Sequence, residues 1–514
     1  MSTPWSSVEI ALPATVAHDD PYTGVDVEVV LTHASGRVVR RPAFWDGGST
    51  WRVRFCAAGL AGTWTWAASA SVEDPGLTVT GTLDVPAGTG DGVFERHGFW
   101  RVPEGGRHLV HADGTPAFLV GDTAWALPWR ATVEQAEVYA ADRAAKGFNA
   151  VLLMSVQPDT RAVGPQDRGA DEGFAVAFDD LPGGTLQRLR PDYFQHLDAL
   201  VGVLRRHGIV PVLQPVFQGF GWKGLDAAGT VVPPAQYARY CRYLVARYGA
   251  GPAVWLVGAD GTGDEPQIAA GGREVHAWDD YAQPTGIHYR PHTTADSHQD
   301  ADWLDFQWCQ TGHRGDHVPE RVADMARNLP PKAVANGEPT YENTARTGFA
   351  AGWWQGHEAW GNLCAGAAMG VVYGAGSLWQ WQLHPGETGQ SPLFSAPGAG
   401  WREALAFEGS NYPGVLNRVL HGLPFTGARP DWSHTPNPRN LLVPGVFFLA
   451  YCADGGDLRV VVRDGVPEPY RVVDPRTGEV LARGVLGADG TVPDPGGAPR
   501  VVVFCRDFTG SALE

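Results

Sequence analysis

The sequence has 514 residues, of which 44% are hydrophobic and 18% charged, so the chain can bury a large core and is not disordered as a whole. Its net charge of −17 repels phosphate backbones and anionic lipids, so we expect neither nucleic acid nor a membrane surface as a partner. No apolar run approaches the roughly 20 residues that span a bilayer. The first ten residues, MSTPWSSVEI, lack the basic and apolar segments of a secretory signal. We therefore expect a cytoplasmic protein, or a secreted one whose signal has been removed.

Residues 1–90 are predicted to form an N-terminal β-sandwich. Apolar and polar residues alternate along segments 25–32, 50–56, 63–68 and 77–85, and turns rich in Gly, Asp and Pro separate these segments. The glycine-rich run 87–92 resembles a linker.

Residues 91–424 change to a regular alternation of short apolar runs and amphipathic helices. Helices are expected at 132–146, 192–207 and 234–248, whereas 262–283 is less clear and 157–190 is expected to be a long loop. Eight such units favour a (β/α)₈ barrel, an α/β fold. Its strands are predicted at 117–121, 150–155, 209–216, 254–258, 285–288, 305–307, 333–336 and 377–381.

Residues 425–514 return to short β segments, at 445–452, 458–463, 470–474 and 500–506, separated by Gly, Pro and Asp. A small all-β C-terminal domain is therefore expected. The six cysteines lie far apart and form no C-x-x-C motif, so we expect buried, reduced thiols.

The residues that follow the predicted barrel strands are of particular interest, because catalysis in such barrels takes place at the carboxyl ends of the strands. Carboxylates, amides, histidines and tryptophans are concentrated there, a set that suits a polyhydroxylated ligand. The chain has 20 Trp, and exposed Trp faces commonly stack on sugar rings. The candidate substrate-binding residues are Asp122, Trp125, Gln157, Asp159, Gln214, His288, Gln310, His313, Tyr341, His357, Trp379 and Trp381.

Asp260 and Glu338 form the best candidate catalytic pair. They follow the fourth and seventh predicted strands, which lie nearly opposite one another in an eight-stranded ring. Glycoside cleavage uses two carboxyl groups, one as the acid and the other as nucleophile or base, and their separation decides between retention and inversion. Taken singly, each could instead be a carboxylate that starts a loop or caps a helix.

Several other candidates have structural alternatives. Asp122 could bind a sugar hydroxyl or cap a helix, Asp159 could form a turn, and each histidine could be a buried structural residue. Trp379 and Trp381 alternate along the last predicted strand, so one could stack on substrate while the other belongs to the core.

No metal or other cofactor is predicted. The spacing of His288 and His292 would suit a metal site on a helix, but Pro291 lies between them. Neither a G-x-S-x-G nor a G-x-G-x-x-G motif is present.

The chain resembles the apiosidase-like glycoside hydrolases, which are (β/α)₈ proteins that commonly carry an N-terminal β-sandwich and a C-terminal β-domain labelled collagen-binding. The matching segments are FLVGDTAW (118–125), GFNAV (147–151), VWLVGAD (254–260), QTGH (310–313), NGEPTY (336–341) and AGAAMGVVYG (365–374), with Trp379-Gln380. The resemblance implies that Asp260 is the acid/base and Glu338 the nucleophile. It also implies that Asp122, His313, Tyr341 and Trp379 line the pocket. This chain departs from the family in having Ala259 where a second glycine usually precedes the strand-four Asp.

These observations together predict a glycoside hydrolase that acts on a furanose-type or branched plant or microbial glycan, with retention of configuration. Arabinofuranosidase or another furanosidase specificity stays open. A non-catalytic carbohydrate-binding barrel and a metal-dependent lyase or isomerase are the alternatives from other classes. The expected partner is the carbohydrate substrate, and the flanking β-domains offer surfaces for a homo-oligomer.

Overall fold

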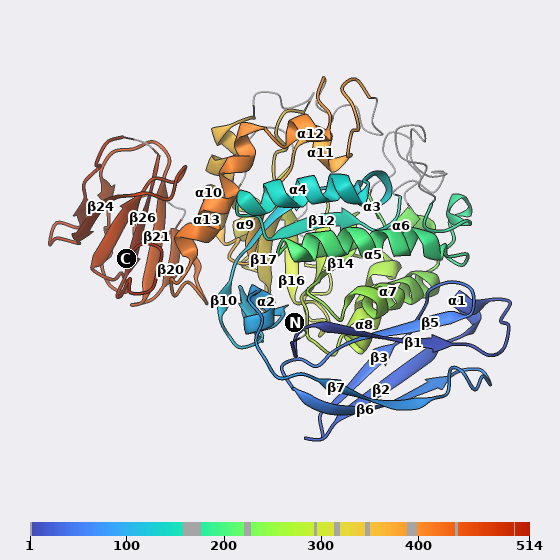
Figure 1. Cartoon of the computed structure of the whole chain (residues 1–514). Helices are drawn as coiled ribbons and strands as arrows, with labels where there is room; N and C mark the ends of the chain where they lie inside the picture. The colour runs from blue at the N-terminus through green and yellow to red at the C-terminus, as the bar shows by residue number, and fades with distance from the viewer. Residues whose placement is uncertain are drawn as a thin grey trace.

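The computed structural model describes residues 3–157, 176–219, 228–291, 296–312, 319–344, 350–387, 398–436, 440–497 and 499–514. A central barrel lies between an N-terminal pair of sheets and a C-terminal sheet (Figure 1). Among the described residues, no helix has both the length and the apolar character needed to cross a bilayer. The six cysteines of the chain form no disulfide, and all except the partly exposed Cys452 are buried.

Eight parallel strands close into a barrel in chain order, which confirms the predicted (β/α)₈ fold. Every residue of these strands is buried except Asp260, which is partly exposed. Strands buried on both faces explain the short, continuous apolar runs of the sequence. The strands are β11 (Leu119–Thr123), β12 (Ala150–Met154), β13 (Val210–Gln214), β14 (Val254–Gly261), β15 (Thr285–Tyr289), β16 (Phe306–Gln310), β17 (Ala333–Glu338) and β18 (Gly370–Tyr373).

The described helices between Leu127 and Leu420 belong to the barrel region, and one of them lies in the segment 262–283 that the sequence left unclear. They are α3 (Leu127–Arg130), α4 (Val133–Ala145), α5 (Pro191–Arg206), α6 (Ala228–Val231), α7 (Pro234–Tyr248), α8 (Pro266–Trp278), α9 (Glu320–Met325), α10 (Trp353–Ala365), α11 (Gly376–Trp379), α12 (Trp401–Ala404) and α13 (Pro413–Leu420), with 3₁₀ turns η1 (Leu181–Gly183) and η4 (Glu408–Asn411). Helix α4 begins after a capping box, in which the Thr132 hydroxyl accepts from the backbone N–H of Gln135 and the Gln135 side chain accepts in return.

The prediction of a strand at 377–381 is wrong. The eighth strand is β18, where Val371 and Val372 supply the β-branched pair, and it pairs with β11 and β17. Gly370 allows this pairing, because a Cβ atom there would lie 2.4 Å from the backbone oxygen of Leu119. Residues 376–379 instead form helix α11, so Trp379 and Trp381 do not alternate along a strand.

The N-terminal sheets form the predicted β-sandwich. One sheet has the order β1 (Ser7–Pro13), β5 (Thr50–Cys56), β4 (Phe44–Trp45), and the other β3 (Val38–Pro42), β2 (Val27–His33), β6 (Gly62–Ala70), β7 (Thr80–Val85). Trp51 and Trp64 are buried between them, so part of the tryptophan excess is core. The short α1 (Pro21–Gly24) lies within this region, and α2 (Val93–His97), β8 (Trp100–Arg101), β9 (Leu109–His111) and β10 (Pro116–Ala117) connect it to the barrel.

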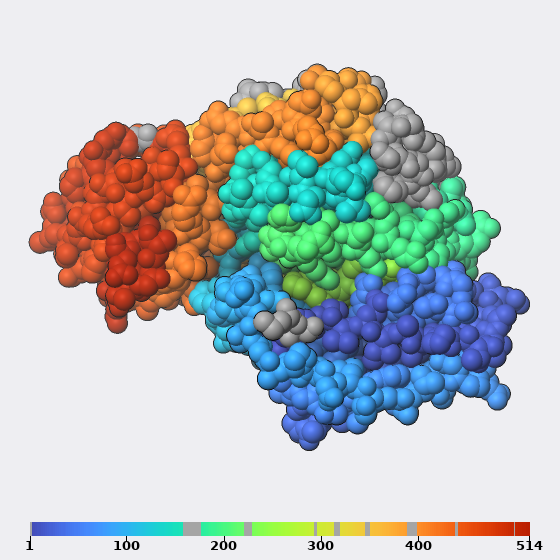
Figure 2. All heavy atoms as spheres, viewed as in Figure 1, coloured from blue at the N-terminus to red at the C-terminus, as the bar shows by residue number. Residues whose placement is uncertain are grey.

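The C-terminal region is the predicted all-β domain. Its six-stranded sheet has the order β19 (Arg429–Asp431), β20 (Asn440–Val443), β21 (Phe447–Cys452), β26 (Arg500–Cys505), β23 (Pro469–Val473), β24 (Val480–Val485), and β22 (Leu458–Arg459) pairs with β25 (Thr491–Val492). It packs on α10, whose Trp360 indole donates to the backbone oxygen of Pro475. Figure 2 shows it as a lobe at the left of the barrel, whereas the sandwich lies beneath the barrel. The domain boundaries predicted near residues 90 and 424 stay predictions.

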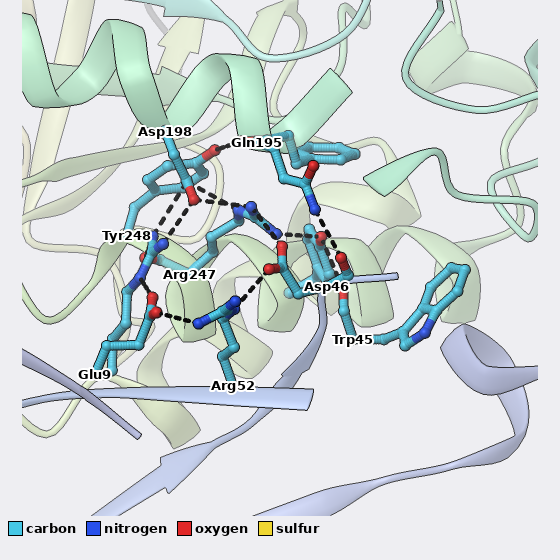
Figure 3. A network of polar contacts seen from close by, with 11 residues as sticks. Glu9, Trp45, Asp46, Arg52, Gln195, Asp198, Arg247 and Tyr248 are labelled. Carbon is cyan, nitrogen blue, oxygen red and sulfur yellow. Dashed lines mark hydrogen bonds and ion pairs between the residues drawn. The ribbon is translucent and has the colours of Figure 1, made fainter. Parts of the chain in front are cut away.

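A network of ion pairs joins the sandwich to the barrel (Figure 3). Arg54 of β5 and Arg247 of α7 both contact Asp198 of α5, at 2.6 and 2.8 Å, and Arg247 also lies 2.9 Å from Asp46. Arg52 pairs with Asp46 and with Glu9, each at 2.6 Å. Burial raises the pKa of Asp198, but the hydrogen bonds and charges of the two arginines outweigh it, and the net pKa is lowered. We call these six residues the interface network.

Candidate active site

Asp260 reaches the mouth of the barrel through an irregularity of β14. The pairing with β15 shifts between Ala259 and Gly261, and Asp260 between them has a φ of +59°. A bulge of this kind redirects one side chain out of the regular alternation, and left-handed backbone at a non-glycine residue is often found at functional sites. The bulge therefore places the Asp260 carboxylate at the mouth of the barrel, where 13% of the side chain is exposed.

Glu338 is the last residue of β17, and a second irregularity precedes it. The pairing with β16 shifts so that Cys309 faces Asn336 while Gln310 faces Glu338. Gly337 therefore has no paired residue on β16. A Cβ atom on Gly337 would lie 1.6 Å from Nε1 of Trp308, so only glycine fits here. The irregular ends of two strands bring one oxygen of Asp260, one oxygen of Glu338 and a ring nitrogen of His288 within 4.8 Å of one another.

His288 lies between the two carboxylates. Its Nε2 is 3.0 Å from Oε2 of Glu338 and 3.6 Å from Oδ1 of Asp260, and the ring is fully buried. Its Nδ1 lies 2.8 Å from the side-chain nitrogen of Gln214, whose oxygen accepts a hydrogen bond of 2.8 Å from the Trp125 indole. Three predicted site residues thus form a chain that leads to the carboxylate pair.

The electrostatics of the pair suit proton transfer. Burial and the nearby charge of Glu338 raise the pKa of Asp260 to about 7, although His288 opposes the shift. Burial lowers the pKa of His288, but the charges of Asp260 and Glu338 outweigh burial and raise it overall. Asp260 can therefore keep a proton near neutral pH.

Asp260, His288 and Glu338 are also close enough to hold a metal ion. A metal-bound histidine usually donates its second ring N–H to an acceptor. Here Nδ1 of His288 faces the amide nitrogen of Gln214, which can only donate, so the neutral ring carries its proton on Nε2 and has no free electron pair there. The arrangement favours acid–base chemistry over metal binding.

Further predicted residues lie around the strand ends. The ring of Trp379 packs against Trp125 and Tyr341, with centroids 5.5 and 6.3 Å apart, and Trp379 is partly exposed while the other two are buried. Gln157, after β12, is 1% exposed, and neither of its amide atoms has a hydrogen-bond partner among the described residues; the same holds for Oε1 of Gln310. A partly exposed aromatic ring is suited to stack on a sugar ring, and amide groups that lack a partner are suited to hydrogen-bond sugar hydroxyls.

Three predicted residues make their contacts elsewhere. Asp122 is fully buried and accepts from Arg143, Tyr139 and the backbone of Thr123. Trp381 stacks on Trp401, with ring centroids 4.8 Å apart, and its indole donates to Gln135. His357 lies on α10 against Tyr451 of the C-terminal sheet. Asp159 and His313 lie outside the described residues.

Two residues that support Asp260 are absent from the predicted set. The side-chain oxygen of Gln218 accepts from the backbone N–H of Ala259, and Glu265 accepts from the backbone N–H groups of Thr262 and Gly263. The T-x-x-E spacing of Thr262 and Glu265 is a capping-box pattern and could have indicated the second contact. Nothing in the sequence distinguishes Gln218 from other polar residues after a strand.

The barrel and its paired carboxylates are those of a glycoside hydrolase. A family model described as "Apiosidase-like, catalytic domain" matches residues 103–427, and one for a domain of unknown function (DUF5060) matches residues 1–71. The first match covers more than half of the chain, so the chain belongs to the apiosidase-like glycoside hydrolase family.

Solved structures share the fold. One, named only as a glycoside hydrolase, is 21% identical and covers 81% of this chain and 98% of its own, with a TM-score of 0.66. A glycoside hydrolase family 5 protein from Bacteroides vulgatus is 21% identical over 83% of this chain and 97% of its own, with a TM-score of 0.67. A second glycoside hydrolase from that organism is 18% identical over 98% of both chains, with a TM-score of 0.71. No curated protein sequence matches the chain.

Proposed function

We propose that this protein is a retaining glycoside hydrolase that cleaves the O-glycosidic bonds of a furanose-type or branched glycan, with Asp260 as the acid/base and Glu338 as the nucleophile. The observation that carries the proposal is that one carboxylate oxygen of Asp260 lies within 4.8 Å of one carboxylate oxygen of Glu338. Retaining enzymes hold their carboxyl groups about 5–5.5 Å apart, whereas inverting enzymes leave about 6.5–9.5 Å for a water molecule.

In the first step, Asp260 donates its proton to the leaving-group oxygen while Glu338 forms a bond to the anomeric carbon, and the glycosidic C–O bond breaks. In the second step, the Asp260 carboxylate takes a proton from water, whose oxygen attacks the anomeric carbon and releases Glu338.

The charge of Glu338 supports this alternation. Burial and the Glu338 carboxylate both raise the pKa of Asp260 in the resting site. Once Glu338 is esterified, its negative charge disappears, and the pKa of Asp260 falls. Asp260 then becomes a base at the step that requires one.

The substrate class rests on the site and on the family. Trp379 offers a partly exposed ring, while the amide group of Gln157 and Oε1 of Gln310 have no hydrogen-bond partner among the described residues, a set suited to a neutral sugar. The family name favours apiose among the furanoses, and arabinofuranose is the main competitor.

The test is a panel of aryl apiofuranosides, arabinofuranosides and common pyranosides, together with plant and bacterial polysaccharides. We expect the fastest hydrolysis on a furanoside, with a first-formed product that keeps the anomeric configuration in a time-resolved NMR spectrum. Inversion would contradict the assignment of Glu338 as nucleophile. Sugar binding without product from any substrate would favour the carbohydrate-binding alternative.

A further inference from the structure

Trp125, Gln214 and His288 come from three different parts of the barrel and meet in the interior. Trp125 follows β11, Gln214 ends β13 and His288 lies in β15. Gln214 and His288 are fully buried, and Trp125 is 7% exposed. Contacts of 2.8 Å join the Trp125 indole to the Gln214 oxygen and the Gln214 nitrogen to His288 Nδ1.

The direction of each hydrogen bond follows from chemistry. An indole N–H can only donate, so the Gln214 atom that faces Trp125 must be the amide oxygen. The amide nitrogen then faces His288, and because an amide nitrogen only donates, Nδ1 of His288 must accept. A neutral imidazole carries one proton, which therefore lies on Nε2, 3.0 Å from Glu338 and 3.6 Å from Asp260.

The same hydrogen bond resists a second proton on His288. An imidazolium would place an N–H on Nδ1 against the N–H of the Gln214 amide. The titratable groups whose charges act on His288 are Asp260 on β14 and Glu338 on β17, and both favour an imidazolium. Gln214 opposes them, and a proton that His288 does not take is left for Asp260.

We propose that Gln214, oriented by Trp125, is a positioning residue that keeps His288 as the neutral Nε2–H tautomer, so that the N–H of His288 faces Glu338 and the mobile proton of the site stays on Asp260. The inference rests on the roles proposed above for Asp260 and Glu338. It assigns to Trp125 and Gln214 a task other than direct contact with the sugar.

The tautomer can be measured without any substrate, in full-length protein labelled with ¹⁵N-histidine. Long-range ¹⁵N–¹H correlations, with His288 identified by the signal lost in His288→Gln, should show Nε2 protonated and Nδ1 unprotonated. In Gln214→Glu, a carboxylate can accept from both Trp125 and His288, so both ring nitrogens should be protonated from pH 5 to 8. A protonated Nδ1 in the unmodified protein, or an unchanged spectrum in Gln214→Glu, would overturn the proposal.

Kinetics then test the consequence for catalysis. Gln214→Glu should lower kcat by about 100-fold or more while KM changes by less than about threefold, because a misprotonated histidine harms the reaction more than binding. The pH dependence of kcat/KM that the unmodified enzyme shows should be absent from Gln214→Glu. Gln187 is exposed, so Gln187→Glu makes the same charge change away from the site and should alter neither kcat nor KM.

Two further variants cover the case in which Gln214→Glu does not fold. Gln214→Met removes the amide without adding charge, and Trp125→Phe removes the indole donor; each should lower kcat by about tenfold and allow a protonated Nδ1. Unchanged kcat and an unchanged tautomer in both folded variants would refute the positioning role. If no glycoside is cleaved even by the unmodified protein, the proposed function fails, while the tautomer measurement still decides the role of Gln214.

Discussion

Two clusters of ionisable side chains in this molecule shift the pKa of an aspartate in opposite directions. In the interface network, Asp198 is contacted by Arg54 and Arg247, and its pKa is lowered. At the strand ends, Asp260 and Glu338 share one histidine, and the pKa of Asp260 is raised to about 7.

The difference lies in the balance of charge. Guanidinium groups stay protonated and match carboxylates with paired N–H donors, so they hold a buried carboxylate in its ionised form. Two carboxylates beside one imidazole cannot all keep full charge, so a proton is shared and can move. The first arrangement joins the sandwich to the barrel, and the second is suited to the proton transfer proposed for the site.

The largest expected effect is on the proposed nucleophile. Glu338→Gln keeps the shape of the side chain but removes the negative charge that attacks the anomeric carbon, so kcat should fall by about 10⁴-fold or more. Initial rates on the best aryl furanoside would measure it. The exposed Glu104→Gln is the matched control and should retain full activity. Near-normal turnover in Glu338→Gln would contradict the role of Glu338 as nucleophile. The contrast between a structural and a reactive cluster would then fail.

The second prediction concerns the interface network. Asp198→Asn leaves Arg247, which is fully buried, without one of its two carboxylate partners. We expect a loss of about 2–3 kcal/mol in the free energy of unfolding, somewhat below that of a completely buried pair, because 21% of the Asp198 side chain is exposed. Denaturant unfolding at pH 7 would measure it, and kcat of the folded variant should not change.

The sign of its pH dependence also follows. The pKa of Asp198 is lowered in the folded protein, so its contribution is present above the ordinary carboxyl pKa and is lost as pH falls through the folded pKa. The two proteins should therefore converge in acid. Asp192→Asn on the same helix removes an exposed pair with Arg190 and contacts with backbone N–H groups in the first turn of α5, and should cost less than about 1 kcal/mol. Equal losses in the two variants would contradict the network's role.

The third prediction is that Asp260→Asn at the active site raises the free energy of unfolding above pH 7, whereas Asp198→Asn in the interface network lowers it. Because the pKa of Asp260 is raised, the stability linked to its proton is present below the ordinary carboxyl pKa and is lost as pH rises through about 7. Asp260→Asn should therefore be more stable than the unmodified protein at pH 8, by about 1–2 kcal/mol, and no more stable below pH 4. Thermal unfolding at the two pH values would measure it.

Activity provides the companion measurement. In the unmodified enzyme kcat/KM should fall as pH rises through about 7, where Asp260 loses its proton, and this limb should be absent from the residual activity of Asp260→Asn. Loss of stability at pH 8 together with a retained basic limb would show that another group supplies the proton.

The fold and the position of Asp260 and Glu338 at strand ends were within reach of the sequence because both depend on local patterns. Short apolar runs between helices predict a parallel barrel, and Asp260 and Glu338 directly follow two such runs. The eighth strand was misplaced because the alternation of residues 377–381 looks like a strand, although Val371 and Val372 form the pairing segment.

Features that depend on distant contacts could not be predicted. The bulge at Asp260 and the contact of Gly337 with Trp308 exist only when neighbouring strands are in place. Likewise, Trp381 belongs to the core because it meets Trp401, and Gln214 faces His288 because β13 and β15 both border β14. A residue's position after a strand indicates that it lies near the rim, but not whether it faces the ligand or another side chain.

Aromatic rings extend the comparison to the smallest expected effect. In the interface, the guanidinium groups of Arg54 and Arg247 cover the ring of Phe44, at 5.1 and 4.7 Å from its centroid. At the site, the ring of Trp379 packs against Trp125 and Tyr341 with interplanar angles of 68° and 48°, and it stays partly exposed, so part of the ring is available to a sugar.

Trp379→Ala should therefore raise KM by about tenfold, equivalent to about 1.4 kcal/mol of binding free energy, and change kcat by less than about threefold. Trp432, an exposed tryptophan beside the C-terminal sheet, provides the control, and Trp432→Ala should leave KM on a small glycoside unchanged. If Trp379→Ala instead lowered kcat and left KM unchanged, the ring would act on the transition state or on Tyr341 rather than hold the sugar. An equal rise in KM in both variants would mean that exposure alone, and not the position of Trp379 beside the carboxylates, determines binding.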